Sequence, residues 1–244
     1  MHPVDHQPSN AAESRSNAAF TPLQETFYKE MYGDLVDGGA VGVFHRLTHR
    51  SLERPFGPED SLPRVIEVGS GNGEHLPFVR HSFESYVMAD LRMPPEMPED
   101  PRVSFLEADV HELPVESNSY DRLIATCLLH HLAEPFRALE EMRRVVRPGG
   151  ALSIMIVSDP GLAYRAIQRI SSGRRYRKSG FKEWRALHAM EHRNHAWSLQ
   201  QLIKYAFRED ELRGRGFPVP IASVWNLNLF SVYQVKLRPE RAPA

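Results

Sequence analysis

Short apolar runs alternate with longer amphipathic stretches over the middle of the chain. Each run is rich in β-branched or aromatic residues and ends near glycine, aspartate or proline, which is typical of buried strands. The runs cover residues 65–68, 86–90, 103–109, 120–127 and 152–157. Between them the pattern predicts helices, one starting near Glu74 and one over residues 135–146. Pro148-Gly149-Gly150 should stop the chain sharply. Strands that alternate with helices predict a parallel sheet that is covered on both faces.

The segments before this alternation have a different composition. Residues 1–19 are polar, small and proline-bearing, and we expect a disordered tail. Residues 20–60 predict a helical N-terminal lid and a linker, with helices around Leu23–Tyr32 and Val41–Leu52. The main domain should therefore occupy residues 61–244.

The segment after the fifth strand breaks the alternation. Residues from about 160 to 198 are basic and aromatic, and we expect them to form an inserted cap. A helix over Leu199–Phe207 should follow. Two further runs, 211–217 and 229–237, can pair as closing antiparallel strands.

The overall composition is that of a globular protein. The 244 residues are 41% hydrophobic and 25% charged, enough for one large domain with a sizeable core. No apolar run approaches the roughly 18 residues of a membrane span, and no secretory signal is evident. The single cysteine, Cys127, excludes an intramolecular disulfide, and we expect a cytoplasmic protein.

The net charge of −1 hides a strong asymmetry. Residues 1–60 carry −4, residues 61–150 carry −6 and residues 151–244 carry +9. Such a division often marks a partner of opposite sign. A negatively charged acceptor or partner is therefore expected for the basic last part of the chain.

A glycine-rich turn follows the first predicted strand, at Glu67-Val68-Gly69-Ser70-Gly71-Asn72-Gly73. Glycines there let the chain turn tightly and let a ligand approach the backbone, although a simple strand-to-helix turn needs them too. The dinucleotide spacing G-x-G-x-x-G is not met, because Glu74 follows Gly73. The chain has no Gly-Lys dipeptide, which excludes a P-loop, and no Tyr/Lys pair at the spacing of short-chain dehydrogenases.

Two aspartates end the second and third predicted strands. Asp90 could accept hydrogen bonds from both ribose hydroxyls of an adenosine, and Asp109 could accept one from an adenine amino group. Each could instead be a loop carboxylate that caps a turn. Their shared position is more specific than either residue, because ligands of open α/β sheets bind at the carboxyl ends of the strands.

Five motifs together resemble those of the class I S-adenosylmethionine-dependent methyltransferases, and more narrowly the branch called methyltransferase type 11. They are VIEVGSGNGEH, YVMADLR, FLEADVHELP, YDRLIATCLLHHL and EEMRRVVRPGGALSIMI, all within residues 64–157. The resemblance implies a Rossmann-like seven-stranded, mostly parallel sheet with an antiparallel edge. It also implies S-adenosyl-L-methionine as cofactor.

The resemblance also implies roles for single residues. The loop from Gly69 to Gly73 would wrap the methionine part of the cofactor, and Glu67 would help to hold its amino group. Asp90 would take the ribose hydroxyls. Leu91 would pack on adenine, and Asp109 with Val110 would read the adenine edge. The cofactor residues implied are Glu67, Gly69, Ser70, Gly71, Asn72, Gly73, Asp90, Leu91, Asp109, Val110 and Cys127.

His130 and His131, after the fourth strand, are the candidate catalytic residues. Histidine titrates near neutrality and suits proton removal from a nucleophile, but consecutive residues do not share a face, so at most one should point inward. Either could instead fill space or start a helix. Cys127 is expected to form part of the pocket wall and not to act as a nucleophile, because methyl transfer needs no covalent intermediate.

Candidate acceptor-binding residues come from the lid and the insert. They are Tyr28, Tyr32, His45 and His49 in the lid, and Arg174 and Arg175 in the insert. The tyrosines could equally be core residues, and the arginines could belong to a solvated loop. His188, His192 and His195 have spacings that would stack them on one helical face. However, no carboxylate or cysteine partner is evident, and no metal is expected.

The sequence thus predicts methyl transfer to an oxygen or nitrogen of a small, anionic metabolite or glycan precursor. An RNA methyltransferase stays open but is disfavoured, because no RNA-binding module accompanies the basic insert. The same motifs also leave room for an NAD-dependent oxidoreductase, which is less favoured, or for a non-catalytic binding protein with this fold. No transmembrane segment is expected, and the oligomeric state is left open.

Overall fold

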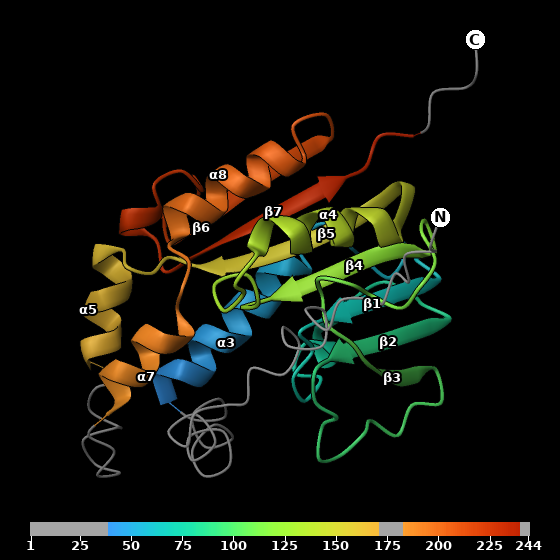
Figure 1. The fold of residues 1–244 in the computed structure, drawn as a ribbon, viewed down its shortest axis with the longest axis horizontal. Helices are drawn as coiled ribbons and strands as arrows, with labels where there is room; N and C mark the ends of the chain where they lie inside the picture. Colours follow the sequence, from blue (N-terminus) through green and yellow to red (C-terminus); the bar gives the residue numbers. More distant parts are fainter. Residues whose placement is uncertain (1–38, 171–182, 240–244) are drawn as a thin grey trace, which may run out of the picture.

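A computed structural model describes residues 39–170 and 183–239 of the chain (Figure 1). Several expectations concern other residues and lie outside this part. They are the tail over residues 1–19, the first helix of the lid with Tyr28 and Tyr32, and Arg174 and Arg175 of the insert.

Seven strands of the described residues form one sheet, in the order β3-β2-β1-β4-β5-β7-β6. β1 to β5 run parallel, and β7 is antiparallel to both of its neighbours, β5 and β6. This confirms the predicted sheet and its antiparallel edge. The strands are β1 (Arg64–Val68), β2 (Ser85–Asp90), β3 (Val103–Glu107), β4 (Tyr120–Thr126), β5 (Val146–Val157), β6 (Glu211–Phe217) and β7 (Phe230–Lys236).

Helices cover the two faces of the sheet unequally. On one face, α3 (Gly39–Leu52) packs against β5 and β7. On the other face, α4 (Pro135–Val145) and α8 (Ala196–Ala206) pack on each other and on β5. α5 (Leu162–Ile170) and α7 (Trp184–Glu191) lie beyond the carboxyl ends of β4 and β5 (Figure 1). The carboxyl edge of the sheet therefore faces these two helices.

The period of two along each strand divides the core between the faces. Ile66 and Val68 of β1 join the large cluster under α4 and α8, together with Leu123 of β4. Val65 belongs to a separate cluster on the opposite face. Both faces of the central strands are buried, as expected for parallel strands between helices.

Two local predictions were wrong. No α-helix starts near Glu74; a turn leads into a short 3-10 helix, η1 (Leu76–Phe78). Pro77 has no N–H to extend an α-helical ladder, and the buried ring of His75 is held by Glu53.

Pro148-Gly149-Gly150 does not stop the chain before a fifth strand either. It lies inside β5, where the pairing with β4 shifts register between Tyr120 and Arg122. Gly149 adopts a φ of 77° there, and its N–H donates to the carbonyl of Leu237. The segment is thus an irregularity within a longer strand.

The described parts of the insert are helical. α5 and α7 come from the two ends of the predicted cap, and α8 begins three residues before the predicted helix start at Leu199. None of the helices in the described part is long and apolar enough to cross a membrane.

Candidate functional site

Three glycines after β1 build the turn that the sequence singled out. Gly69, Gly71 and Gly73 have φ values of 65°, 54° and 79°, a backbone region that side chains disfavour. A Cβ on Gly69 would lie 2.8 Å from Cδ1 of Leu128, so the loop passes directly beside the end of β4. The side chain of Ser70 is buried, and its hydroxyl has no hydrogen-bond partner among the described residues.

Asp90 at the end of β2 shapes this loop. Its Oδ2 accepts a hydrogen bond of 2.9 Å from the N–H of Gly71, and its Oδ1 accepts one from the N–H of Arg92. The aspartate therefore binds the glycine loop from the neighbouring strand, and its side chain is half-buried at the carboxyl edge. A ligand lying across this edge would meet the loop and the carboxylate together.

Glu67 lies below the loop, fully buried in β1. Its Oε2 accepts a hydrogen bond of 2.7 Å from the hydroxyl of Tyr86. Burial raises the pKa of Glu67 to about 8, and the nearby carboxylates of Glu74 and Asp90 act in the same direction. At neutral pH this carboxyl holds its proton, and a cation placed in the loop would favour its ionisation.

Asp109 follows β3 and is already engaged within its own turn. Its Oδ1 accepts from the N–H of His111 at 2.9 Å and from Nδ1 of the same histidine at 2.6 Å. Val110 is buried, whereas Leu91 is 56% exposed and so available for a flat ligand. His111 was not singled out by the sequence, yet its Nε2 is buried without a partner in the described structure.

Cys127 follows β4 in a left-handed conformation, with a φ of 52°. Its N–H donates to the carbonyl of Met155 at 3.3 Å. Burial raises the pKa of the Cys127 thiol to about 12, so the side chain stays a neutral thiol. A strained backbone at the carboxyl end of a central strand is common at functional sites.

His130 and His131 have unlike surroundings. His130 is 3% exposed, and its Nδ1 has no partner in the described part of the chain. Burial, together with the nearby rings of His131, His192 and His188, holds the pKa of His130 well below its usual range. His131 is partly exposed; its Nδ1 lies 2.9 Å from the carbonyl of Glu191 and 3.1 Å from Oε2 of the same residue.

The chain segments around α7 bring further titratable groups to these histidines. His188 of α7 and His192 just after it have ring centroids 3.9 Å apart, and His192 lies 4.4 Å from the ring of His130. Nδ1 of His192 lies 3.1 Å from Oδ2 of Asp159, which follows β5. His195 is exposed at the start of α8, so the three histidines of the sequence pattern do not share one face.

A second group of histidines lies between α3 and the sheet. Nε2 of His49 is 2.8 Å from Nε2 of His45, and Nδ1 of His49 is 2.8 Å from Nδ1 of His75. His75 in turn contacts Glu53, which forms a buried ion pair with Arg122 of β4. His49 is 2% exposed and has both nitrogens occupied. It therefore anchors α3, and acceptor binding by His45 and His49 stays a prediction.

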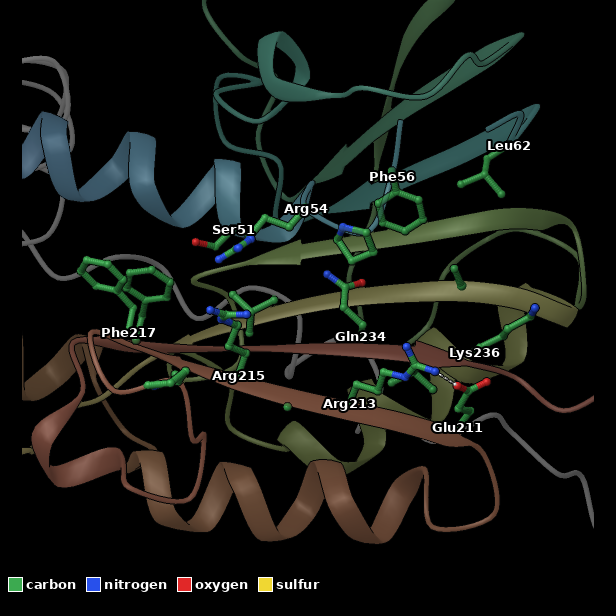
Figure 2. Close-up of a pocket in the computed structure, with 18 of the residues that line it drawn as sticks. Ser51, Arg54, Phe56, Leu62, Glu211, Arg213, Arg215, Phe217, Gln234 and Lys236 are labelled. Carbon is green, nitrogen blue, oxygen red and sulfur yellow. Dashed lines mark hydrogen bonds and ion pairs between the residues drawn. The ribbon is translucent and has the colours of Figure 1, made fainter. Parts of the chain in front are cut away.

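A hollow of about 990 Å³ lies elsewhere (Figure 2). It runs along the face of β6 and β7, beside the end of α3, between Arg54 and Phe56 on one side and Arg213, Arg215 and Lys236 on the other. It does not include the glycine loop, Asp90 or the histidines after β4. Those residues lie instead at the carboxyl ends of β1, β2 and β4.

The comparison with protein families matches the central part of the chain. Residues 66–154 match a family model described as a methyltransferase domain. The match spans β1 to most of β5 and includes the glycine loop, Asp90, Asp109 and His130. Asp159, His188 and His192 lie outside it.

Similar sequences and structures agree with that match. A demethylmenaquinone methyltransferase of Clavibacter sepedonicus is 29% identical over 103 residues, which cover 40% of this chain and 42% of the relative. The chain thus spans less than half of that relative's length.

Two solved structures match the fold over most of this chain. A methyltransferase of Haloferax volcanii, solved with the Trm112 methyltransferase activator, has a TM-score of 0.58 at 16% identity and covers 89% of this chain and 98% of that one. An S-adenosylmethionine-dependent methyltransferase of Thermotoga maritima has a TM-score of 0.53 at 19% identity, with coverages of 88% and 99%.

Proposed function

Residues 66–154 form a methyltransferase domain on a class I S-adenosylmethionine-dependent methyltransferase fold, and from this premise we propose that the chain methylates a small-molecule acceptor. One observation carries the proposal. Three left-handed glycines follow β1, Asp90 of β2 holds the middle one, Gly71, and the buried Ser70 hydroxyl between them has no partner among the described residues. This leaves the cradle open to a ligand at the carboxyl edge of the sheet.

The residues of this cradle suit the cofactor. When bound, S-adenosylmethionine supplies an electrophilic methyl group on a cationic sulfonium. The glycine loop would accommodate its methionine part, and Asp90, whose carboxylate lies at the same edge, would accept hydrogen bonds from the ribose hydroxyls. Burial raises the pKa of Glu67, so its carboxyl holds a proton in the empty site. A cation in the loop would lower that pKa, because a nearby positive charge favours the ionised carboxylate, and Glu67 would then lose its proton.

His131, and not His130, is the candidate base. A base works best with a pKa near the working pH, and the pKa of the buried His130 lies well below that. In His131, Nδ1 faces the carbonyl and carboxylate of Glu191, so its proton is directed there and Nε2 is left to accept one. Leu128, which packs beside Gly69, would help to exclude water from the reacting atoms.

For the acceptor we propose an oxygen or nitrogen of a small anionic molecule. The +9 charge of residues 151–244 supports an anion, as do the exposed Arg165 and Arg169 on α5. Carbon methylation is the second candidate, because a ubiquinone/menaquinone biosynthesis C-methyltransferase of Coxiella burnetii is 36% identical over 61 residues, which cover 25% of this chain and 24% of that relative. Methylation of RNA stays open but disfavoured.

A labelled-methyl screen tests the proposal. The protein would be incubated with S-adenosylmethionine carrying a deuterated methyl group and with metabolite, glycan-precursor, quinone and RNA pools, and products would be found by mass spectrometry. We expect a mass increase in a small molecule and formation of S-adenosylhomocysteine. Asp90→Ala should lower the yield, whereas Asp100→Ala, between β2 and β3, should not. Label confined to RNA would overturn the small-molecule assignment, and unchanged cofactor in every pool would overturn the activity.

A further inference from the structure

Side chains with metal-ligand chemistry converge where the loops after β4 and β5 meet α7. Ligand atoms of Asp159, His188 and His192 lie within 4.8 Å of one another. His192 also belongs to a second such group with His130 and His131. The residues come from three separate parts of the sequence, so the fold and not local spacing brings them together.

Two histidine nitrogens in this cluster are buried, where a polar atom is normally hydrogen-bonded. Nδ1 of His130 and Nε2 of His188 are buried and have no hydrogen-bond partner among the described residues. His130 itself is only 3% exposed. Buried polar atoms are nearly always paired, and an unpaired one often marks a missing ion or water. His188 belongs to the group that contains the Asp159 carboxylate, His130 belongs to the adjoining group, and His192 is common to both.

The chemistry of these donors favours a transition metal over other ions. Imidazole nitrogen and one carboxylate suit Zn²⁺ or a related divalent ion, whereas Ca²⁺ and Mg²⁺ prefer oxygen donors.

We propose that Asp159, His188 and His192 bind a divalent transition-metal ion of the zinc class, with His130 as an adjoining donor. The four residues lie after the carboxyl ends of β4 and β5 or in and just after α7. Three of them fall outside the segment that matches the methyltransferase domain. Most of the site therefore lies outside the matched segment.

The backbone around the site is already fixed by hydrogen bonds. The N–H groups of Arg193 and Asn194 both donate to the carbonyl of His130, at 2.9 and 3.2 Å. The Asn194 amide donates to the carbonyls of Leu129 and Leu132, and the Ala196 N–H donates to that of Asp159. These bonds join the loop after α7 to the ends of β4 and β5. A rigid frame of this kind lets the side chains keep a ligand geometry before the ion binds.

A consequence for the acceptor rests on the proposed function. The ion, when bound, would lower the pKa of an acceptor hydroxyl that ligates it, so that the proton could leave to solvent. The oxygen's electron pair would form the new bond to the methyl carbon, and the electron pair of the broken C–S bond would stay on sulfur. The acceptor class is thereby narrowed to a hydroxyl compound that can bind a metal through oxygen.

Cobalt substitution tests the site without any acceptor. The full chain, free of any affinity tag and treated with a chelator, would be titrated with Co²⁺ and followed by visible absorption, and then with Zn²⁺ in competition. We expect saturable d–d bands at one ion per chain, removed by Zn²⁺. Absence of saturable bands, or binding that Zn²⁺ cannot displace, would overturn the proposal. Calorimetry with S-adenosylhomocysteine on the same sample would show separately whether the cofactor site works.

Single substitutions test which side chains bind the ion. His188→Ala and His192→Ala should each weaken Co²⁺ binding by at least about 10- to 100-fold, a loss that even groups supporting a metal ligand cause. His195→Ala is the matched control, an exposed histidine close in sequence and outside both groups, and should bind as the unaltered chain does. If His188→Ala fails to fold, His188→Gln tests the same nitrogen with less loss of volume. Unchanged affinity in folded variants of both ligands would place the ion elsewhere and overturn the assignment.

Discussion

The protein buries two clusters of histidines, and they differ in how their nitrogens are used. The first cluster, His45, His49 and His75 with Glu53 and Arg122, joins α3 to β4. The second, Asp159, His130, His188 and His192, lies at the carboxyl edge of β4 and β5. We call them the closed and the open cluster.

In the closed cluster, one placement of the histidine protons gives each contact a donor and an acceptor. Nε2 of His75 donates to Glu53, which leaves Nδ1 of His75 to accept from Nδ1 of His49. Nε2 of His49 then accepts from His45. Both buried rings are neutral in this arrangement, in keeping with the lowered pKa of His49, about 2, and of His75. The cluster ends on the carboxylate of Glu53 and the guanidinium of Arg122.

No such arrangement completes the open cluster. His192 contacts Asp159, but Nδ1 of His130 and Nε2 of His188 find no partner in the described part of the chain. The comparison teaches that burial of histidines alone does not indicate a ligand site. What distinguishes the two is whether the protein itself supplies a partner for each nitrogen that is removed from water.

The largest expected effect is on the closed cluster. Glu53→Gln should lower the free energy of unfolding by about 3–5 kcal/mol, because the buried guanidinium of Arg122 loses its counter-charge. Denaturant titration followed by circular dichroism would measure it. Glu112→Gln removes one partner of an exposed ion pair with Arg137 and should cost less than about 1 kcal/mol. Equal losses in the two variants would mean that Glu53 does not anchor α3.

Metal should stabilise the folded protein only through the open cluster. At a free Zn²⁺ concentration about 100 times the dissociation constant, the gain should be about 2.7 kcal/mol, because the ion binds the folded state. Thermal unfolding with and without Zn²⁺ would measure it. At the same Zn²⁺ concentration His188→Ala should reduce the gain to about 1.4 kcal/mol or less, because its site is at least about 10-fold weaker, whereas His195→Ala should retain it. An undiminished gain in folded His188→Ala protein would contradict the distinction between the clusters.

Acid should destabilise the metal-free protein through its neutral histidines. His49 has a pKa of about 2 when folded against an ordinary value of 6.5, so below pH 6.5 the unfolded chain binds the proton and the folded chain does not. The contribution of this histidine is then complete above pH 6.5 and falls by up to about 1.4 kcal/mol per pH unit below it. Glu67, with a folded pKa of about 8 against 4.5, acts in the opposite direction between pH 8 and 4.5, because the folded chain binds its proton first. Glu53, with a folded pKa of about 2 against 4.5, adds its loss only below pH 4.5.

Unfolding free energies of Glu67→Gln protein, which lacks the opposing carboxyl, at half-unit steps from about pH 7.5 downward would follow this loss. A decline that begins only below pH 4.5, the ordinary pKa of a glutamate such as Glu53, would show that carboxylates, and not buried neutral histidines, carry the acid response.

The smallest effect is expected for a histidine that belongs to neither cluster. His195 is exposed, and its side chain does not cap α8. His195→Ala should change the free energy of unfolding by no more than about 0.5 kcal/mol, as is usual for surface positions. The same denaturant titration would measure this. A larger loss would place His195 in a network with Asp159 and blur the boundary of the open cluster.

Local sequence pattern predicted the sheet well because each strand is marked where it lies. The β-branched run over residues 65–68 and the aspartate at 90 needed no distant information. The helix near Glu74 was wrong because Pro77 and the contact between His75 and Glu53 override the expected strand-to-helix transition. The Pro148-Gly149-Gly150 break was wrong because pairing partners on both sides carry β5 through it.

The two clusters could not be predicted in full, because their partners are far apart in sequence. The pattern of His188, His192 and His195 suggested a metal site but lacked a carboxylate, which Asp159 supplies from the end of β5. His195 had the right spacing, yet α7 ends at Glu191 and the face is not shared. Arg122 lies inside an apolar strand and 69 positions from Glu53, so only the fold reveals their ion pair.

The proposed methyl transfer depends on the binding of S-adenosylmethionine by Asp90 and the loop from Gly69 to Gly73. Calorimetric titration of the full chain with S-adenosylhomocysteine tests it directly. We predict saturable binding that Asp90→Ala weakens by about 1–3 kcal/mol, because the ribose hydroxyls and the Gly71 N–H lose their acceptor, while Asp100→Ala binds as the unaltered chain does. No binding at millimolar ligand, or equal affinity in the two variants, would contradict the account.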